Sequence, residues 1–143
     1  MFLLDANVLI ALGDAGHAHG DAAIRFFEEE AVRSGWATCP LTENAFLRIL
    51  GNPGYPNGPG STEGARMQLA KLIAAPGHQF WPDDLSLTDA KKLPRLPASR
   101  DLTDLYLLAL AVKRQARFAS FDAGVDASLV AGGDRAFYLI PGG

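Results

Sequence analysis

The sequence predicts an α/β domain whose central, mainly parallel sheet of four to five strands is covered by helices on both faces. Short apolar runs typical of strands alternate along the chain with longer amphipathic segments typical of helices, and this alternation favours parallel strands. The 143 residues match the usual size of one domain, and no internal repeat or shift in composition marks a boundary. We therefore expect residues 1–143 to form a single domain.

The N-terminal segment predicts a strand that runs directly into a helix. Phe2 to Leu4 is a short apolar run, and a second run from Val8 to Leu12 fits a helix. Asp5, Ala6 and Asn7 form the polar break between them, which places Asp5 at the carboxyl end of the strand.

The next elements are an amphipathic helix, a strand and a second helix. The segment from Gly20 to Arg33 has the helical pattern, with Arg25/Glu29 and Glu29/Arg33 at the spacing of i,i+4 ion pairs. A brief strand is expected from Trp36 to Cys39. Pro40 then opens a helix from Leu41 to Leu50 that contains Glu43 near its start.

The middle of the chain is rich in glycine and proline. Residues Gly51 to Thr62 contain four Gly and three Pro, which predicts a surface loop that either flanks the site or is a tolerated insertion. A helix is expected from Glu63 to Ala75 and a strand from His78 to Trp81. The segment from Asp83 to Pro97 shows no regular pattern.

The strongest helical signal comes from Asp101 to Gln115, where Asp104 shares a face with Leu108 and Ala111. A strand from Arg117 to Phe121 follows and ends at Asp122, and a final strand is expected from Ala136 to Ile140.

The composition limits the functions that the protein can have. The single Cys39 excludes an internal disulfide, and the absence of a Cys/His cluster excludes a thiolate zinc site, so we expect a cytoplasmic protein. The apolar N-terminus lacks a basic leader and is too short to span a membrane, so no membrane partner is expected. A net charge of −3 means that contact with a polyanion must be local or mediated by metal.

Four acids are expected at one edge of the sheet. Asp5 and Asp122 follow strands, and ligands of parallel sheets bind beyond the carboxyl ends of the strands. Glu43 and Asp104 lie in the first turns of helices that open on the same edge. Two like charges 4 Å apart repel by about 4 kcal/mol at an effective dielectric of about 20, which bound cations would relieve. Mg²⁺ and Mn²⁺ favour carboxylate and water ligands.

Each acid also has a structural interpretation. Asp5 fits a helix cap or a turn, and Asp101 with Asp104 has the spacing of a capping box. Asp122 before Ala123 and Gly124 fits a turn, and Glu43 favours the dipole of its helix. The residues alone leave both interpretations open.

Around these acids the sequence resembles the PIN-domain family, and within it the VapC-type toxins of bacterial toxin–antitoxin pairs. The matching segments occur in the order of the family from Leu3 to Val125: LLDANVLIAL, LTENAFLRIL, LTDLYLLALA and FASFDAGV. Each motif is loose by itself, but four in register are specific. The segment AGHAHGDAAIRFF adds a weaker similarity.

The resemblance implies a Rossmann-like three-layer α/β/α domain that binds Mg²⁺ or Mn²⁺ and cleaves RNA, leaving a 5′-phosphate and a 3′-hydroxyl. By position, Asp5 and Asp104 would be the principal metal ligands, and Asp122 with Glu43 would complete the pocket directly or through water. Asn7 and Ser120 would support them by hydrogen bonds, and Asp101 would either cap its helix or modify the cation site.

The resemblance also implies an RNA substrate, a cognate VapB-like antitoxin and a homodimer. The segment KKLPRLPASR is the candidate RNA-contacting surface, although a solvated loop explains it equally well; its basic residues are Lys91, Lys92, Arg95 and Arg100. The negative net charge favours a shaped RNA, such as a tRNA or a ribosomal stem-loop, over nonspecific binding.

Two alternatives remain at this point. A haloacid-dehalogenase-like phosphatase also begins with an aspartate after the first strand, but its D-x-D pattern meets Asn7 here and its catalytic lysine is missing. A catalytically inactive PIN-like or receiver-like module would bind partners without chemistry, although the presence of all four acids favours an enzyme.

Overall fold

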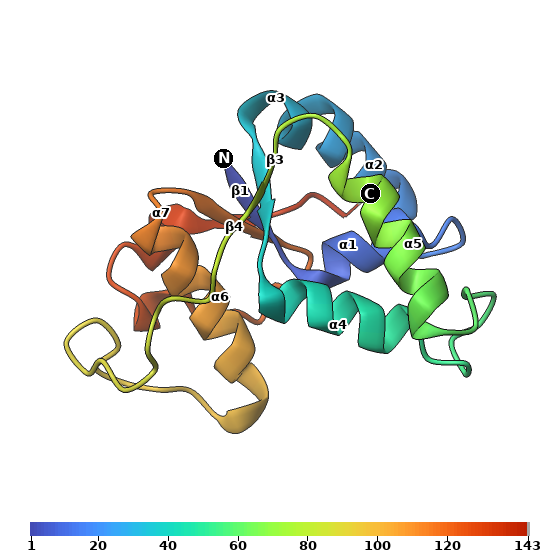
Figure 1. Cartoon of the computed structure of the whole chain (residues 1–143). Helices are drawn as coiled ribbons and strands as arrows, with labels where there is room; N and C mark the ends of the chain where they lie inside the picture. Colours follow the sequence, from blue (N-terminus) through green and yellow to red (C-terminus); the bar gives the residue numbers. More distant parts are fainter. Residues whose placement is uncertain (143) are drawn as a thin grey trace.

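The computed structural model describes residues 1–142 and places β1 (Phe2–Leu4) at the centre of a five-stranded sheet (Figure 1). The strand order is β3-β2-β1-β4-β5, and every neighbouring pair is parallel. The predicted α/β class and all five predicted strands are confirmed. The other four strands are one or two residues shorter than expected: β2 (Trp36–Thr38), β3 (His78–Phe80), β4 (Arg117–Ser120) and β5 (Phe137–Leu139).

Helices cover both faces of this sheet, as Figure 1 shows. One face carries α6 (Leu102–Lys113) and α7 (Gly133–Ala136), and Leu3 and Phe118 pack there with Leu108. The other face carries α1 (Ala6–Gly13), α2 (Gly20–Phe26), α4 (Pro40–Leu50) and α5 (Thr62–Ile73). Leu4 and Trp36 are fully buried on that second face against Phe46, as the alternation of strand side chains requires.

The helix predicted from Gly20 to Arg33 forms, but its middle is a π-helix. After α2 the chain continues as η1 (Phe27–Ala31), a π-helical segment, and then as α3 (Val32–Ser34). The predicted ion pairs of Glu29 with Arg25 and Arg33 are wrong, because neither is formed among residues 1–142. A π-helical turn bonds residues five apart, so side chains four apart no longer align.

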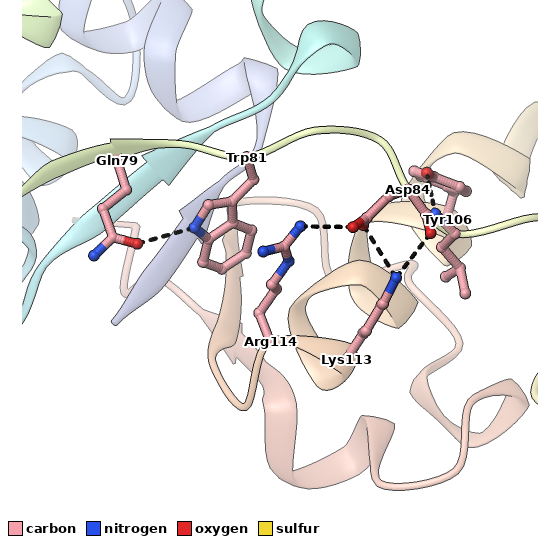
Figure 2. Close-up of polar contacts among 7 residues, drawn as sticks. Gln79, Trp81, Asp84, Tyr106, Lys113 and Arg114 are labelled. Carbon is pink, nitrogen blue, oxygen red and sulfur yellow. Dashed lines mark hydrogen bonds and ion pairs between the residues drawn. The ribbon is translucent and has the colours of Figure 1, made fainter.

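The segment between β3 and α6 has no regular helix or strand, as predicted, but its beginning is anchored to the end of α6 (Figure 2). The carboxylate of Asp84 pairs with Lys113 at 3.2 Å and with Arg114 at 3.0 Å, and the guanidinium of Arg114 lies 5.6 Å from the ring centre of Trp81. Trp81 in turn donates its Nε1–H to Gln79 at 3.1 Å. The segment then reaches η2 (Ser99–Asp101), a 3-10 turn that leads into α6.

Two short helical elements after β4 were not predicted: η3 (Ala127–Leu129) and α7. Each is too short to show a period in the sequence. Of the helices within residues 1–142, none combines the length and the apolar character that crossing a bilayer requires.

Candidate active site

The hydroxyl group of Ser120 connects three other polar groups at the carboxyl end of β4. It donates a hydrogen bond to Oδ2 of Asp5 at 2.6 Å. It accepts hydrogen bonds from Nδ2 of Asn7 at 3.2 Å and from the backbone N–H of Asp122 at 3.0 Å. The parallel register makes this possible, because β1 pairs with β4 up to Leu4 and Ala119, directly before Asp5 and Ser120. The structure thus brings Asp5, Asn7, Ser120 and Asp122 together.

Asp104, in the first turn of α6, joins Asp5 and Asp122 to make a group of three aspartates. Its carboxyl group is half-buried, and desolvation together with the charges of Asp5 and Asp122 raises its pKa to about 7. A side-chain interaction with Asp122 raises the pKa of Asp104 further. Asp101, one turn earlier, adds a smaller repulsion of the same sign. These acids therefore form a coupled group in which full ionisation is unfavourable.

Asp5 is the most buried member of this group, with 8% of its surface exposed. Burial raises the pKa of its carboxyl group and the charge of Asp122 raises it further, while the Ser120 hydrogen bond and the N–H dipoles of Ala6 and Asn7 lower it. Among residues 1–142, no lysine, arginine or histidine forms an ion pair with Asp5, Asp104 or Asp122. The negative charge of the group is uncompensated by the protein.

Glu43 extends from α4, which packs on the face of the sheet opposite to α6. Its Oε2 accepts a hydrogen bond from Oγ1 of Thr38 at 2.7 Å, and that oxygen lies 2.8 Å from Nε2 of His78. Sequence reasoning missed both partners. Thr38 ends a parallel strand, a position that could have indicated it, but the contact of His78 depends on strand register and leaves no signal in the sequence.

The structural interpretations of the acids have different outcomes. Neither Asp5 nor Asp101 caps its helix with its side chain. Asp122 does form the expected turn, since its Oδ1 accepts the backbone N–H of Gly124 at 2.8 Å. The start of α4 is capped by Cys39 and Thr42, and Glu43 lies within its first turn. Asp5, Asp101 and Asp104 thus do not form the side-chain caps that the sequence suggested.

A pocket of about 270 Å³ opens beside Asp104 and Asp101, walled by the segment before α6 and by the turn after Asp122. Arg95, one of the predicted RNA-contacting residues, lines this pocket. Nε of Arg100 lies 3.7 Å from Oδ2 of Asp101. Lys92 instead lines a separate, mostly apolar pocket with Leu85 and Val112, and the backbone N–H groups of Lys91 and Lys92 both donate to Asp89. The basic segment therefore reaches the acids through its second half.

The chemistry of the three aspartates suits a hard divalent cation, because their ligand atoms are all oxygens and no basic side chain within residues 1–142 forms an ion pair with them. In the side-chain arrangement of residues 1–142, no three His, Cys, Asp or Glu residues form a ready-made metal cage. Mg²⁺ commonly uses only one or two protein carboxylates and keeps several waters, so such a cage is not required.

Comparison with known proteins identifies the family of this chain. The PIN domain model matches residues 2–128. Ribonuclease VapC38 of Mycobacterium tuberculosis is 44% identical over 126 residues, which are 87% of each chain. Ribonuclease VapC39 of the same organism is 41% identical over 91% of this chain and 94% of its own.

A crystal structure shares the fold. It is that of M. tuberculosis VapC20, described as a "Sarcin-Ricin loop cleaving toxin", and it superimposes with a TM-score of 0.62 over 92% of this chain and 97% of that chain, at 14% identity. The chain belongs to the PIN-domain family. Within that family its relatives are the VapC ribonucleases, as the resemblance of the four motifs indicated.

Proposed function

We propose that this protein is a divalent-metal-dependent endoribonuclease, the toxin of a toxin–antitoxin pair, which hydrolyses phosphodiester bonds in a structured RNA such as tRNA or rRNA. The observation that carries the proposal is the group of three aspartates at the edge of the sheet. Burial and the charges of Asp5 and Asp122 raise the pKa of Asp104 to about 7, and no basic side chain within residues 1–142 forms an ion pair with the three aspartates. The relatives named ribonuclease support the reaction class.

Asp5, Asp104 and Asp122 would hold Mg²⁺ or Mn²⁺. The bound cation would supply Lewis acidity toward the scissile phosphate and toward water. The protein supplies the positions: Ser120 fixes Oδ2 of Asp5, and Asn7 and the N–H of Asp122 fix the hydroxyl of Ser120. Glu43 is the fourth acid, placed from the opposite face to orient or deprotonate the attacking water. Attack by water forms the new P–O bond as the bond to O3′ breaks, which leaves a 5′-phosphate and a 3′-hydroxyl.

The pocket beside Asp104 is the proposed place for the nucleotide next to the scissile bond. Its walls combine apolar surface with the charged groups of Arg95 and Asp101. Arg95 and Arg100 are the basic residues proposed to contact the RNA phosphates, with Lys91 and Lys92 further along the same segment.

The proposed partners are a VapB-like antitoxin and a second copy of the chain. A toxin of this kind requires an inhibitor in its own cell, and exposed apolar side chains on two helices are candidates for such contacts. These are Ile24 on α2 and Leu41 and Ile49 on α4. Co-purification with the product of an adjacent small reading frame, and light scattering of the isolated protein, would test the two contacts separately.

The test of the function is cleavage of purified tRNA and rRNA with Mg²⁺ or Mn²⁺, followed by sequencing of the RNA ends. We expect cleavage that EDTA abolishes and that Asp5→Asn or Asp104→Asn eliminates while the circular dichroism spectrum stays unchanged. Asp134→Asn, which alters an exposed aspartate of α7, is the matched control and should retain full activity. Cleavage that persists in EDTA, or at the wild-type rate in both site variants, would show that the function is wrong.

A further inference from the structure

We propose that Thr38 and His78 position Glu43 for RNA cleavage through a chain of two hydrogen bonds that runs from β3 through β2 to α4. The inference rests on the proposed function, because it assigns to Thr38 and His78 a role in the reaction proposed for Glu43. Neither residue lies in the four acidic motifs, and both act on the reaction only through Glu43.

The direction of the chain follows from the donors that each group possesses. A threonine hydroxyl has a single proton, and Oγ1 of Thr38 donates it to Oε2 of Glu43 at 2.7 Å. The contact of 2.8 Å between Oγ1 and Nε2 of His78 must then have the imidazole as the donor. His78 therefore carries a hydrogen on Nε2, and the chain of donors runs from His78 to Thr38 to Glu43.

The sheet holds this chain in place. Thr38 is fully buried at the end of β2, and β3 pairs in parallel beside it, with His78 opposite Trp36. The imidazole of His78 packs against the indole of Trp36 with ring centres 4.7 Å apart, which limits its rotation. Trp36 is itself fully buried and donates its Nε1–H to the carbonyl of Pro76 at 3.0 Å. The orientation of the first donor is thus set by the core.

The chain of hydrogen bonds has a direct effect on Glu43. A glutamate side chain has three rotatable bonds, and Glu43 is only partly buried, so packing alone does not fix its carboxylate. The hydrogen bond from Thr38 occupies Oε2, while Oε1 makes no hydrogen bond within residues 1–142 and is the oxygen that we assign to the attacking water.

The first experiment removes and restores the hydroxyl group. Thr38→Val keeps the shape of the side chain without the donor. We expect the cleavage rate to fall by about tenfold or more, the usual loss when a residue that orients a metal-site side chain by a hydrogen bond is removed. Thr38→Ser keeps the donor and should recover most of the rate. Thr62→Val, an exposed threonine at the start of α5, is the matched control. Each variant is checked by its thermal unfolding midpoint.

The second experiment asks whether Thr38 acts through Glu43. If it does, Thr38→Val should slow wild-type protein but should cause no further loss in Glu43→Gln, so that the two effects are not additive. His78→Gln, whose amide can still donate, should retain more activity than His78→Phe. A wild-type rate in folded Thr38→Val, or losses that add fully, would overturn the inference.

A third measurement needs no catalysis. Nitrogen chemical shifts of His78 should show a hydrogen on Nε2 in the wild-type protein, and this state should lose its preference in Thr38→Val. A neutral imidazole with its hydrogen on Nδ1 in the wild-type protein would show that the chain of hydrogen bonds is wrong. If the wild-type protein cleaves no RNA but His78 has the expected hydrogen, the proposed function fails while the geometry stands.

Discussion

At the scale of single residues, Asp104 shows why the site depends on its surroundings rather than on one side chain. Its carboxyl group is half-buried and faces Asp5 and Asp122, so that ionisation adds a charge where two acids already lie. A proton on one carboxyl group or a bound divalent cation relieves this repulsion. The two must therefore compete, and the folded protein should respond to both.

This competition predicts how stability varies with pH when metal is absent. In the unfolded chain an aspartate titrates near 3.9, whereas burial and two acids raise the pKa of Asp104 to about 7 in the folded protein. Between these values the folded state holds a proton that the unfolded state has lost. The free energy of unfolding should therefore fall as pH rises from about 4 to about 7, and this contribution should level off above that range.

The measurement is urea unfolding in EDTA at pH 5 and pH 8. Asp104→Asn cannot ionise and should show a smaller fall in the midpoint between the two pH values than the wild-type protein. Added Mg²⁺ should restore the wild-type midpoint at pH 8 and leave the variant nearly unchanged. The same pH dependence in Asp104→Asn and in the wild-type protein would contradict the assignment.

Which residues could be found from sequence depends on how they are brought together. Asp5, Asp104 and Asp122 stand next to predicted strand or helix ends, so their convergence follows from topology, and the structure places them with Asn7 and Ser120 as expected. The partners of Glu43 depend on which strands are neighbours and in what register, information that no local pattern contains. For that reason the sequence predicts the acid but not the groups that orient it.

At the scale of elements, the π-helical turn η1 shows the same limit. The periodicity of Gly20 to Arg33 correctly predicts a continuous helix, yet one extra residue per turn between Phe27 and Ala31 changes which side chains align. Glu30 accepts a hydrogen bond from the hydroxyl of Tyr138 at 2.8 Å, on strand β5. Long-range packing therefore overrides the local ion pairs that the sequence indicated.

The loop from Gly51 to Thr62 is closed at its base, and this gives a prediction. A Cβ atom added to Gly51 would clash with the carbonyl oxygen of Leu47 in α4, and it would also lie 2.8 Å from Cα of Thr62 and 3.0 Å from the carbonyl oxygen of Ser61. The end of α4 and the far end of the loop therefore approach this position as only glycine allows. We expect Gly51→Ala to destabilise the protein by about 1–3 kcal/mol, the usual cost of overpacking.

The control is Gly54→Ala in the same loop. Its added Cβ would meet only the flexible side chain of Asn52, at 3.3 Å, and Gly54 is exposed, so the unfolding midpoint should hardly change. Chemical denaturation of both variants distinguishes a closed loop from a mobile one. Equal stability of the two variants would mean that the ends of the loop do not need to approach.

At the scale of the whole molecule, the net charge of −3 and the position of the basic residues limit how RNA can bind. Only the segment before α6 combines four basic residues without an acid, and its second half reaches the site. Four basic groups can neutralise at most four phosphates. Affinity should therefore depend on the shape of the RNA and on the cation more than on general attraction to polyanions.

The small number of basic residues near the site predicts the salt dependence of RNA binding. For tRNA and the cleavage-inactive Asp104→Asn variant, the slope of log K against log salt should be no steeper than about −4, near −0.9 for each neutralised phosphate. Adding Arg95→Ala and Arg100→Ala should reduce the slope by about 2. Adding Arg25→Ala and Arg33→Ala, which removes two charges elsewhere, should leave it nearly unchanged. Identical slopes in all of these proteins would exclude the basic segment as a contact.

The central position of β1 also determines when, during synthesis of the chain, the site can form. β1 precedes the other four strands in the chain, yet its neighbour β4 begins only at Arg117, and Asp104 and Asp122 come much later in the sequence than Asp5. A nascent chain in which β1 and α4 have been synthesised but α6 and β4 have not contains Asp5 and Glu43 without the acids that complete the group. The proposed nuclease centre can therefore form only after Asp104 and Asp122 have left the ribosome, so a shorter nascent chain does not carry it.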